Sequence, residues 1–409
     1  MHFLNEYKGL GRNNYILFIG KMMTSFGSMV FSMITLILSQ KLGVKATEIA
    51  VLMFLVGIIS MPVGMIGGKL ADRCSKKKVI IICDIVSIVS CFYAAIVPLS
   101  MTSIVVFALG SLFQSMEYPS YTALIAEVTP SSKRQQAYSL NYLGMNLGMV
   151  LSPAIAGFLF KDYLWLMFVL QAVCIGFSTV LIAVFLNESL TYESDNEYEE
   201  ARDNHSLKEV MKANPLIVFF ALVNAVYFAV YSEYQYLLPL DMGSVHGNNG
   251  ALIYGTVSSI NCIVVVLFTP LITKWFAKMS DIIKVETGSI LVVLGFVMYI
   301  VLRGYVPAYY LVMTVFTWGE IFATISMDAY VTARTPSSHL GRIIAFENVV
   351  QALMMGIYEM LVGNAYDHLG SSLTWVIVIG TGIMAVVMYD SIRRKDYRIY
   401  SNLYEKQGN

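Results

Sequence analysis

Residues 68–78 read GKLADRCSKKK, a polar and strongly basic stretch between two apolar blocks at residues 47–68 and 78–97. Each block is about twenty residues long, the length that a helix needs to cross ~30 Å of hydrocarbon. Lys and Arg are enriched in the loops of membrane proteins that face the cytoplasm. The stretch therefore predicts a hairpin of two membrane helices with its basic turn on the cytoplasmic side.

The composition of the whole chain agrees with this hairpin. Of the 409 residues, 57% are hydrophobic and 13% charged, and the mean hydropathy is +0.66. Soluble domains carry about 25% charged residues, so a chain this apolar needs lipid around it. The formal net charge is zero, so nothing in the overall charge points to nucleic acid, and we expect no nucleic-acid partner.

Twelve apolar blocks are long enough to be membrane spans. They cover roughly residues 14–39, 47–68, 78–97, 101–124, 138–160, 163–186, 215–240, 250–275, 283–302, 307–332, 342–365 and 371–390. With both termini inside the cell, 22 of the 27 Lys and Arg fall on the cytoplasmic side, and Lys21 lies within the first span. The exceptions in the outer loops are Lys41, Lys45, Lys161 and Arg303. This asymmetry predicts a multi-pass protein of the cell (inner, or cytoplasmic) membrane with both termini cytoplasmic.

The chain contains an internal repeat. The sequence Thr-Pro-Ser-Ser occurs at 129–132 and again at 335–338, each time in the cytoplasmic turn after a fourth span. The same offset superposes Gly157 on Gly363. Two six-helix halves related by an axis along the membrane normal are typical of transporters, with the substrate site near the midplane between them. The fold class that we predict is an all-α membrane protein of twelve transmembrane helices in two pseudo-symmetric halves.

The longest polar segment separates these halves. Residues 187–214 are acidic and have no apolar periodicity, which is typical of a flexible linker. The predicted organisation is an N-terminal six-helix half at 1–186, a cytoplasmic linker at 187–214, a C-terminal six-helix half at 215–390 and a cytoplasmic tail at 391–409.

The order Gly-x-Leu-Ala-Asp-Arg at residues 68–73, followed by the lysines at 76–78, resembles the signature loop of the major facilitator superfamily. Ser75 stands where the signature has a second glycine. The resemblance implies the major facilitator fold and a transporter that works by alternating access. It also implies that this loop latches the cytoplasmic side in the outward-open state.

The chemistry of the loop suits a latch. Gly68 permits a close backbone approach at the end of its span. Asp72 can lie against a helix N-terminus, where the helix dipole favours a carboxylate, and the resemblance names the start of span 11 near Gly341 as the partner. Arg73 and the lysines after it can contact anionic lipid headgroups.

Span 5 carries a second pattern, formed by Gly144, Gly148, Pro153 and Gly157. It resembles the span-5 motif of the drug:proton antiporters in the twelve-helix branch of the superfamily. Small residues four apart let helices pack closely, and proline bends a helix. The resemblance favours export over import. Those antiporters usually carry an arginine in span 4 where this chain has Ser111, so an arginine at that place does not couple protons here.

Ionisable residues inside the spans are the main candidates for function, because each costs about 2.5–3.5 kcal/mol at the bilayer centre unless it is paired or hydrated. The candidates are Lys21, Glu117, Glu233, Glu320, Asp328, Glu347 and Glu359. A carboxylate in a low-dielectric cavity can load and release a proton near neutral pH, and its charge also attracts an organic cation. For substrate binding and proton coupling we favour Glu320, then Glu233, then Glu117.

Three of these residues have alternative interpretations. Asp328 and Glu347 lie toward the cytoplasmic end and can be structural partners of Arg334 or Arg342. Lys21 can pair with a nearby acid or extend to the inner face of the membrane.

Tyrosines gather around Glu233 in span 7. Tyr231 is placed to offer a cation–π contact to a lipophilic cation. Tyr234 and Tyr236 are also explained by the belt of aromatic residues at the outer membrane interface.

The function that we predict is proton-coupled efflux of lipophilic or cationic small molecules, by a multidrug-type antiporter that is not an enzyme. The expected partners are a small-molecule substrate, protons and the lipid bilayer, with the chain a monomer. We expect no cofactor and no metal, since neither a phosphate-binding Gly-rich loop nor a metal-ligand pattern occurs. One alternative is a proton symporter that imports a polar metabolite. Another, from a different class, is a transport-inactive sensor or assembly protein on the same fold.

Overall fold

The computed structural model describes residues 9–186, 211–212, 214–335 and 337–400. Every secondary-structure element in these ranges is a helix, and none is a β-strand. The predicted acidic linker at 187–214 lies almost entirely outside the described residues. So do Pro336 of the second Thr-Pro-Ser-Ser sequence and residues 401–409 of the predicted tail.

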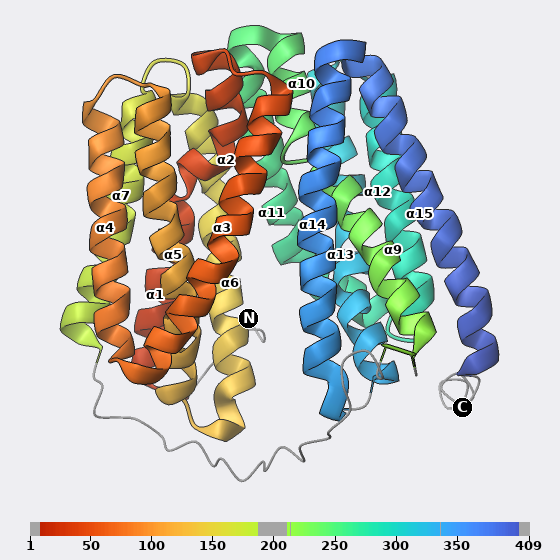
Figure 1. Cartoon of the computed structure of the whole chain (residues 1–409), viewed down its shortest axis with the longest axis horizontal. Coiled ribbons are helices and arrows are strands. Elements are labelled where there is room, and N and C mark those ends of the chain that lie inside the picture. Colours follow the sequence, from red (N-terminus) through yellow and green to blue (C-terminus); the bar gives the residue numbers. More distant parts are fainter. Residues whose placement is uncertain (1–8, 187–210, 213, 336, 401–409) are drawn as a thin grey trace. The chain divides into compact units, whose positions relative to one another are not determined.

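The helices follow one another along the chain as Figure 1 labels them. The α-helices are α1 (Arg12–Gly27), α2 (Met29–Leu36), α3 (Ala46–Arg73), α4 (Lys76–Ile96), α5 (Met101–Glu127), α6 (Arg134–Leu159), α7 (Leu164–Val180), α9 (Pro215–Ser232), α10 (Leu237–His246), α11 (Gly250–Trp275), α12 (Asp281–Val301), α13 (Val306–Arg334), α14 (Ser337–Leu369) and α15 (Ser371–Ile399). Shorter helical turns are η2 (Ile37–Lys41), η3 (Ser131–Lys133), η4 (Leu181–Phe185) and η5 (Gly247–Asn249). The predicted all-α class is confirmed, and each of the twelve predicted spans falls on one of these helices or on consecutive ones.

Ten helical segments of the described chain are long and apolar enough to cross a membrane. One of them, Pro215–Trp275, contains two of the predicted spans. The predicted span at 101–124 forms α5 but is not among the ten. Gln114 and Glu117 lie in its second half and lower its hydropathy. The predicted number of twelve transmembrane helices therefore stays a prediction.

The helices form two compact units. Unit 1 consists of Met1–Val44, Leu52–Glu197 and Met242–Cys262, and unit 2 of Lys45–Val51, Tyr198–Asp241 and Ile263–Asn409. Thus the first turn of α3 packs with unit 2, and the first half of α11 packs with unit 1. Packing partners rather than chain order decide where these two segments belong, and the predicted boundaries of the halves stay a prediction.

Each unit has its own packing pattern. In unit 1, α4 lies against α5 and α7, and α1 lies against α6 and α7. In unit 2, α12 packs on α13 and α15, while α9 packs on α14 and α15.

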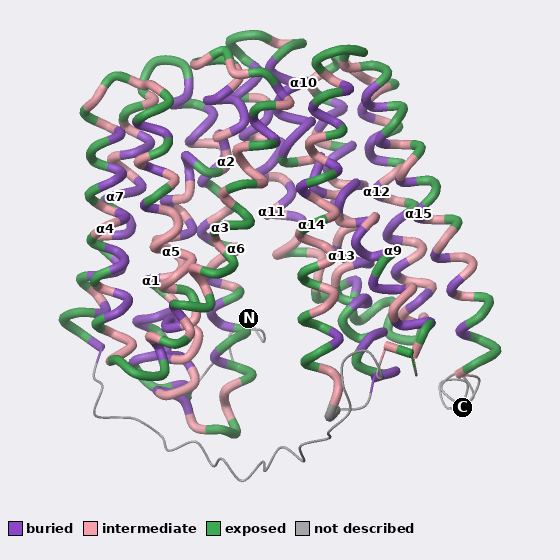
Figure 2. The backbone as a smooth tube through the Cα atoms, viewed as in Figure 1, coloured by how far each residue is buried: buried purple, intermediate pink, exposed green. Residues whose placement is uncertain are grey.

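Apolar side chains remain exposed along the outer faces of the helices. On α4 they recur at helical spacing as Ile82, Ile85 and Val89, each more than half exposed. On α15, Leu373 and Val376 are also more than half exposed. Figure 2 shows exposed positions along both helices. Exposed apolar stripes of this length mark a surface that contacts lipid.

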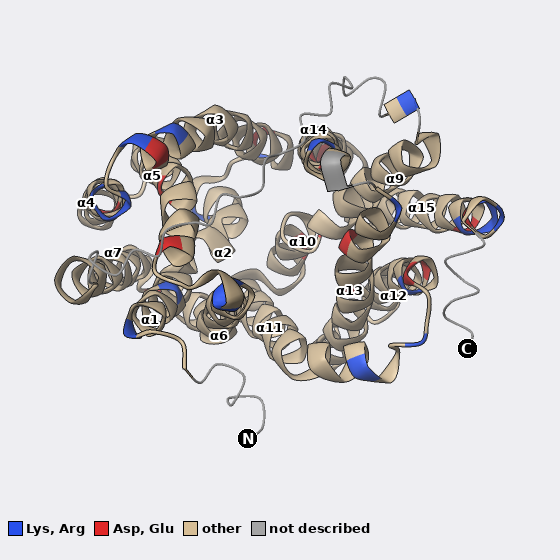
Figure 3. Ribbon diagram, turned by 90° about the horizontal axis from the view of Figure 1, so that it is seen from below, with Lys and Arg blue, Asp and Glu red and all other residues tan. Residues whose placement is uncertain are grey.

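The basic loop between α3 and α4 is built by a helix cap. Ser75, the residue in place of the signature glycine, accepts a hydrogen bond at its side chain from the backbone N–H of Lys78 (3.3 Å) and so caps α4. Serine is a preferred N-cap residue, which explains why it is tolerated here. Lys76 forms an ion pair with Glu127 at the end of α5. Basic residues colour the first turns of α4 and α6 in Figure 3.

The small residues of span 5 lie at close helix contacts within unit 1. A Cβ on Gly144 would lie 2.9 Å from the carbonyl oxygen of Phe18, and one on Gly148 would lie 2.8 Å from the backbone nitrogen of Phe26, both on α1. Further along α6, Pro153 and Gly157 face the first half of α11, where a Cβ on Gly157 would lie 2.9 Å from the Cα of Leu252. Glycine is what allows these backbones to meet.

The first turn of α3 is held within unit 2 by Asp367 at the end of α14. The Asp367 carboxylate accepts hydrogen bonds from the backbone N–H of Ala46 (3.1 Å) and from the backbone N–H and the hydroxyl of Thr47 (2.9 and 2.6 Å). Tyr236 donates its hydroxyl to the carbonyl oxygen of Ala46 at 2.6 Å. A carboxylate at a helix N-terminus satisfies free N–H groups and is favoured by the helix dipole.

We expect Gly148→Ala to lower the melting temperature of the purified protein in detergent. The added methyl group must displace α1, and overpacking costs about 1–3 kcal/mol. Gly380→Ala is the matched control, because no atom lies within 4 Å of a Cβ added there. Equal melting temperatures for the two variants would contradict the packing role of the span-5 glycines.

We expect Asp367→Ala to destabilise the protein by about 0.5–2 kcal/mol, the usual cost of removing a helix cap. Glu48→Ala serves as the control. Glu48 is an exposed acid in the first turn of α3. Its carboxylate accepts one long hydrogen bond (3.3 Å) from the backbone N–H of Lys45. A melting temperature that falls equally in both variants would show that Asp367 has no special role.

Candidate functional site

Each unit holds its own group of the charged residues that the sequence singles out. Unit 1 contains Lys21 on α1 and Glu117 on α5. Unit 2 contains the rest: Glu233 directly after α9, Glu320 and Asp328 on α13, and Glu347 and Glu359 on α14.

Glu320 lies about midway along α13, next to a wall of aromatic rings. The Tyr231 hydroxyl forms a side-chain hydrogen bond with the Glu320 carboxylate. The Tyr231 ring stacks on Phe316 (centroids 5.5 Å apart, planes at 14°) and on Tyr227 (6.1 Å, 18°). Tyr234 completes the wall, 5.5 Å from Tyr231. A carboxylate beside stacked aromatic faces is suited to a lipophilic cation.

Tyr227 and Tyr231 of span 7 therefore interact with Glu320, whereas the sequence alone groups the tyrosines of this span with Glu233. Each residue of a helix is turned about 100° from the previous one, so Tyr227 and Tyr231 share a face that Glu233 does not. The predicted location of Tyr236 in the interfacial belt is also wrong. Tyr236 is 1% exposed and bonds to Ala46, so it is a buried anchor and not part of an interfacial belt.

Glu233 occupies a different environment from Glu320. It is fully buried, and neither of its carboxylate oxygens has a hydrogen-bond partner among the described residues. The acid that interacts with it is Glu359 on α14, and Glu359 also interacts with Ser232.

Glu347 belongs to a third polar cluster of unit 2. Asn224 on α9 donates a hydrogen bond to the Glu347 carboxylate and accepts one from the Tyr389 hydroxyl at 2.6 Å. Asp328 interacts electrostatically with Glu347. Arg334, a candidate partner for both acids, is bonded instead to Asp396 of α15 through two contacts of 2.7 Å.

Unit 1 contains a carboxyl pair that the sequence reasoning missed. Asp84 on α4 is 1% exposed, accepts a hydrogen bond from the Thr179 hydroxyl (2.6 Å), and is hydrogen-bonded to Glu117. Lys21 interacts with Glu117, and its ammonium group lies 5.8 Å from the centre of the Tyr121 ring. The signal was available, since Asp84 is a charged residue inside the predicted span at 78–97.

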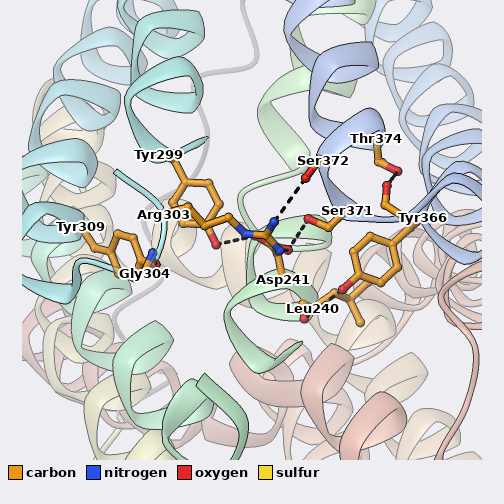
Figure 4. A network of polar contacts seen from close by, with 11 residues as sticks. Leu240, Asp241, Tyr299, Arg303, Gly304, Tyr309, Tyr366, Ser371, Ser372 and Thr374 are labelled. Atoms are coloured by element: carbon orange, nitrogen blue, oxygen red, sulfur yellow. Dashed lines mark hydrogen bonds and ion pairs between the residues drawn. The ribbon is translucent and has the colours of Figure 1, made fainter. Parts of the chain in front are cut away.

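A second missed residue is Asp241, which follows directly after a predicted span. Its buried carboxylate forms an ion pair with Arg303 (2.5 Å) and accepts hydrogen bonds from Tyr299 (2.8 Å) and Ser371. Figure 4 shows these side chains converging from α10, α12 and α15. The charges of Asp241 and Arg303 neutralise each other. This network therefore stabilises the packing of helices within unit 2 and is not a site for a charged ligand.

The predicted latch residues lie at the end of α3, where Asp72 and Arg73 are both exposed. The close backbone approach is one residue earlier than expected. A Cβ on Gly67 would lie 2.9 Å from the Cα of Met116, whereas a Cβ on Gly68 would have no atom of the described chain within 4 Å beyond its own helix. The interaction of Asp72 with the start of α14 stays a prediction.

An all-helical bundle with apolar outer faces and buried acids in each unit defines a membrane transporter. The family model of the Major Facilitator Superfamily matches residues 17–359. The chain belongs to this superfamily.

Known proteins similar to this chain include two that align with about four fifths of it. An uncharacterized MFS-type transporter, YqjV of Bacillus subtilis (strain 168), is 23% identical over 80% of this chain and 80% of its own length. A Na(+), Li(+), K(+)/H(+) antiporter of Planococcus maritimus is 21% identical over 79% of this chain and 82% of its own length. The quinolone resistance protein NorA of Staphylococcus aureus (strain MRSA252) is 29% identical, over 29% of this chain and 31% of its own.

Solved structures share the fold. A peptide transporter POT in complex with sulfate has a TM-score of 0.76 at 16% identity and covers 95% of both chains. A D-xylose–proton symporter has a TM-score of 0.67 at 15% identity, covering 92% of this chain and 96% of that one. At these identities the likeness establishes the fold alone.

Proposed function

We propose that the protein is a proton-coupled antiporter of the cell membrane that exports lipophilic cations by alternating access. The single observation that carries the proposal is the Glu320 carboxylate, bonded by Tyr231 and bordered by stacked aromatic rings. A carboxylate in this setting can accept either a proton or an organic cation, and competition between the two is the simplest way to couple their movements.

Three further observations support this proposal. Glu320 is only partly buried, whereas Glu233 is fully buried. The relative from Planococcus maritimus is named as an antiporter, and NorA as a resistance protein. The positive-inside pattern of the sequence favours cytoplasmic termini.

Removing the Glu320 charge is the sharpest test. In proteoliposomes with an imposed pH gradient, ethidium should drive proton movement opposite to its own flux with the wild-type protein. Glu320→Gln should abolish this exchange, because an amide neither carries a proton nor balances a cation. Tyr231→Phe, which keeps the ring, should weaken ethidium binding less than Tyr231→Ala. The latter loses a cation–π contact of about 0.5–2 kcal/mol, roughly a two- to thirtyfold change in affinity.

Glu48→Gln is the matched control, since it neutralises an exposed acid at the start of α3. Proton and solute movement in the same direction would replace antiport by the import of a polar metabolite. Exchange that survives Glu320→Gln would remove Glu320 from the mechanism. No proton movement with any compound would refute proton coupling and leave a facilitative, sodium-driven or lipid carrier.

A further inference from the structure

Span 7 is broken at Glu233. Helix α9 ends at Ser232 and α10 begins at Leu237, with a turn between them. At the break the backbone N–H groups of Glu233 and Tyr234 bond to carbonyls three residues back, at 3.3 and 3.2 Å, and not to those four residues back. The carbonyl oxygen of Ala229 accepts a hydrogen bond from the Ser232 hydroxyl (3.0 Å).

Breaks of this kind have a physical cost. In hydrocarbon every backbone polar group needs a partner, and irregular backbone at membrane depth is tolerated where it lines a cavity or is buried in protein. In secondary transporters the loosened carbonyls of broken helices coordinate small cations. In span 7 the carbonyls of residues 230–233 each accept a backbone N–H group across the turn, so the oxygen ligands available at this break are those of side chains.

The Glu233 carboxyl lies at this break without a donor. It is fully buried, and both of its oxygens lack a hydrogen-bond partner in the part of the chain that the structure describes. An ionised carboxylate in such a place is too costly to persist alone. It requires either a proton or a bound cation.

Within the described ranges, no positive side chain supplies that charge. The ionisable groups that interact with Glu233 are Glu359 and Tyr358 on α14 and Tyr236 before α10, and none of them is cationic. On α13, Glu320 is engaged by Tyr231. The counter-charge has to come from outside the protein.

We propose that the break in span 7 binds a monovalent inorganic cation, Na⁺, Li⁺ or K⁺, in competition with a proton. The proposed ligands are the carboxylates of Glu233 and Glu359 and the oxygen of the Ser232 hydroxyl. Oxygen ligands suit these hard cations. Full burial of Glu233 excludes the bulky aromatic cations that suit the aromatic rings beside Glu320.

A divalent ion fits less well. Among the described residues no group of three or more His, Cys, Asp or Glu side chains could hold a metal ion. Two carboxylates that share one proton and one monovalent ion make the site neutral. The proposal deepens the proposed antiport and rests on it for transport, but binding at the site can be measured without transport.

The test is equilibrium binding of radioactive sodium to the purified full-length chain in detergent. The wild type should bind sodium saturably at about pH 8, and the affinity should fall about tenfold per pH unit where one proton competes for the site. Unlabelled Li⁺ and K⁺ should displace the label. Glu233→Gln and Glu359→Gln should each lower the affinity at least tenfold, while Glu48→Gln and Glu320→Gln retain it.

The outcomes separate this inference from the proposed function. Absence of saturable sodium binding to the wild type, or binding independent of pH, would overturn the inference. This result needs the wild type alone, so it holds whether or not the variants fold. Loss of binding in Glu320→Gln but not in Glu233→Gln would overturn it as well, by moving the ion to the aromatic site. Ethidium–proton exchange without sodium binding would leave the proposed function standing alone. Sodium binding without ethidium exchange would support the inference and refute the export of lipophilic cations.

Discussion

The constraint on which the rest of the structure depends is that hydrocarbon offers no hydrogen-bond partners. Each backbone N–H and C=O in a membrane must be satisfied within the protein, and a helix does this with local bonds alone. The described chain is accordingly helical throughout, with apolar stripes such as Ile82, Ile85 and Val89 turned outward. Polar side chains are turned inward and pair with one another. Arg334 with Asp396 and Arg303 with Asp241 are examples in unit 2.

Against this background the acids without a cationic partner carry the most information. The Glu320 carboxylate is bonded by a tyrosine and partly exposed, whereas the Glu233 carboxyl is fully buried with no donor among the described residues and sits where its helix is interrupted. The aromatic surroundings of Glu320 suit a large cation, and the buried position of Glu233 suits a small ion or a proton. Two acids of the same unit thus differ in chemistry because of what surrounds them and not because of their side chains.

The sequence predicts candidate residues but not how they pair. It points to Glu320, Glu233 and Tyr231, and it places the tyrosines of span 7 beside Glu233, because nearness along the chain is the only proximity that a sequence shows. The helical turn separates them and brings Tyr231 to Glu320, on a helix distant in sequence. The sequence analysis does not single out Asp84, although it is a charged residue inside a predicted span, as Glu117 is. It does not single out Asp367 either, because Asp367 lies just beyond the predicted span at 342–365.

What the sequence by itself determined is the membrane class, the helix positions and the family, because hydrophobic length, charge asymmetry and the order of the loop at 68–73 are properties of the chain alone. Only the tertiary structure decided which acids are paired, where span 7 breaks, and that the first turn of α3 packs with unit 2. Those features depend on contacts between helices distant in sequence, such as Asp367 with Thr47, and no local pattern specifies such a contact.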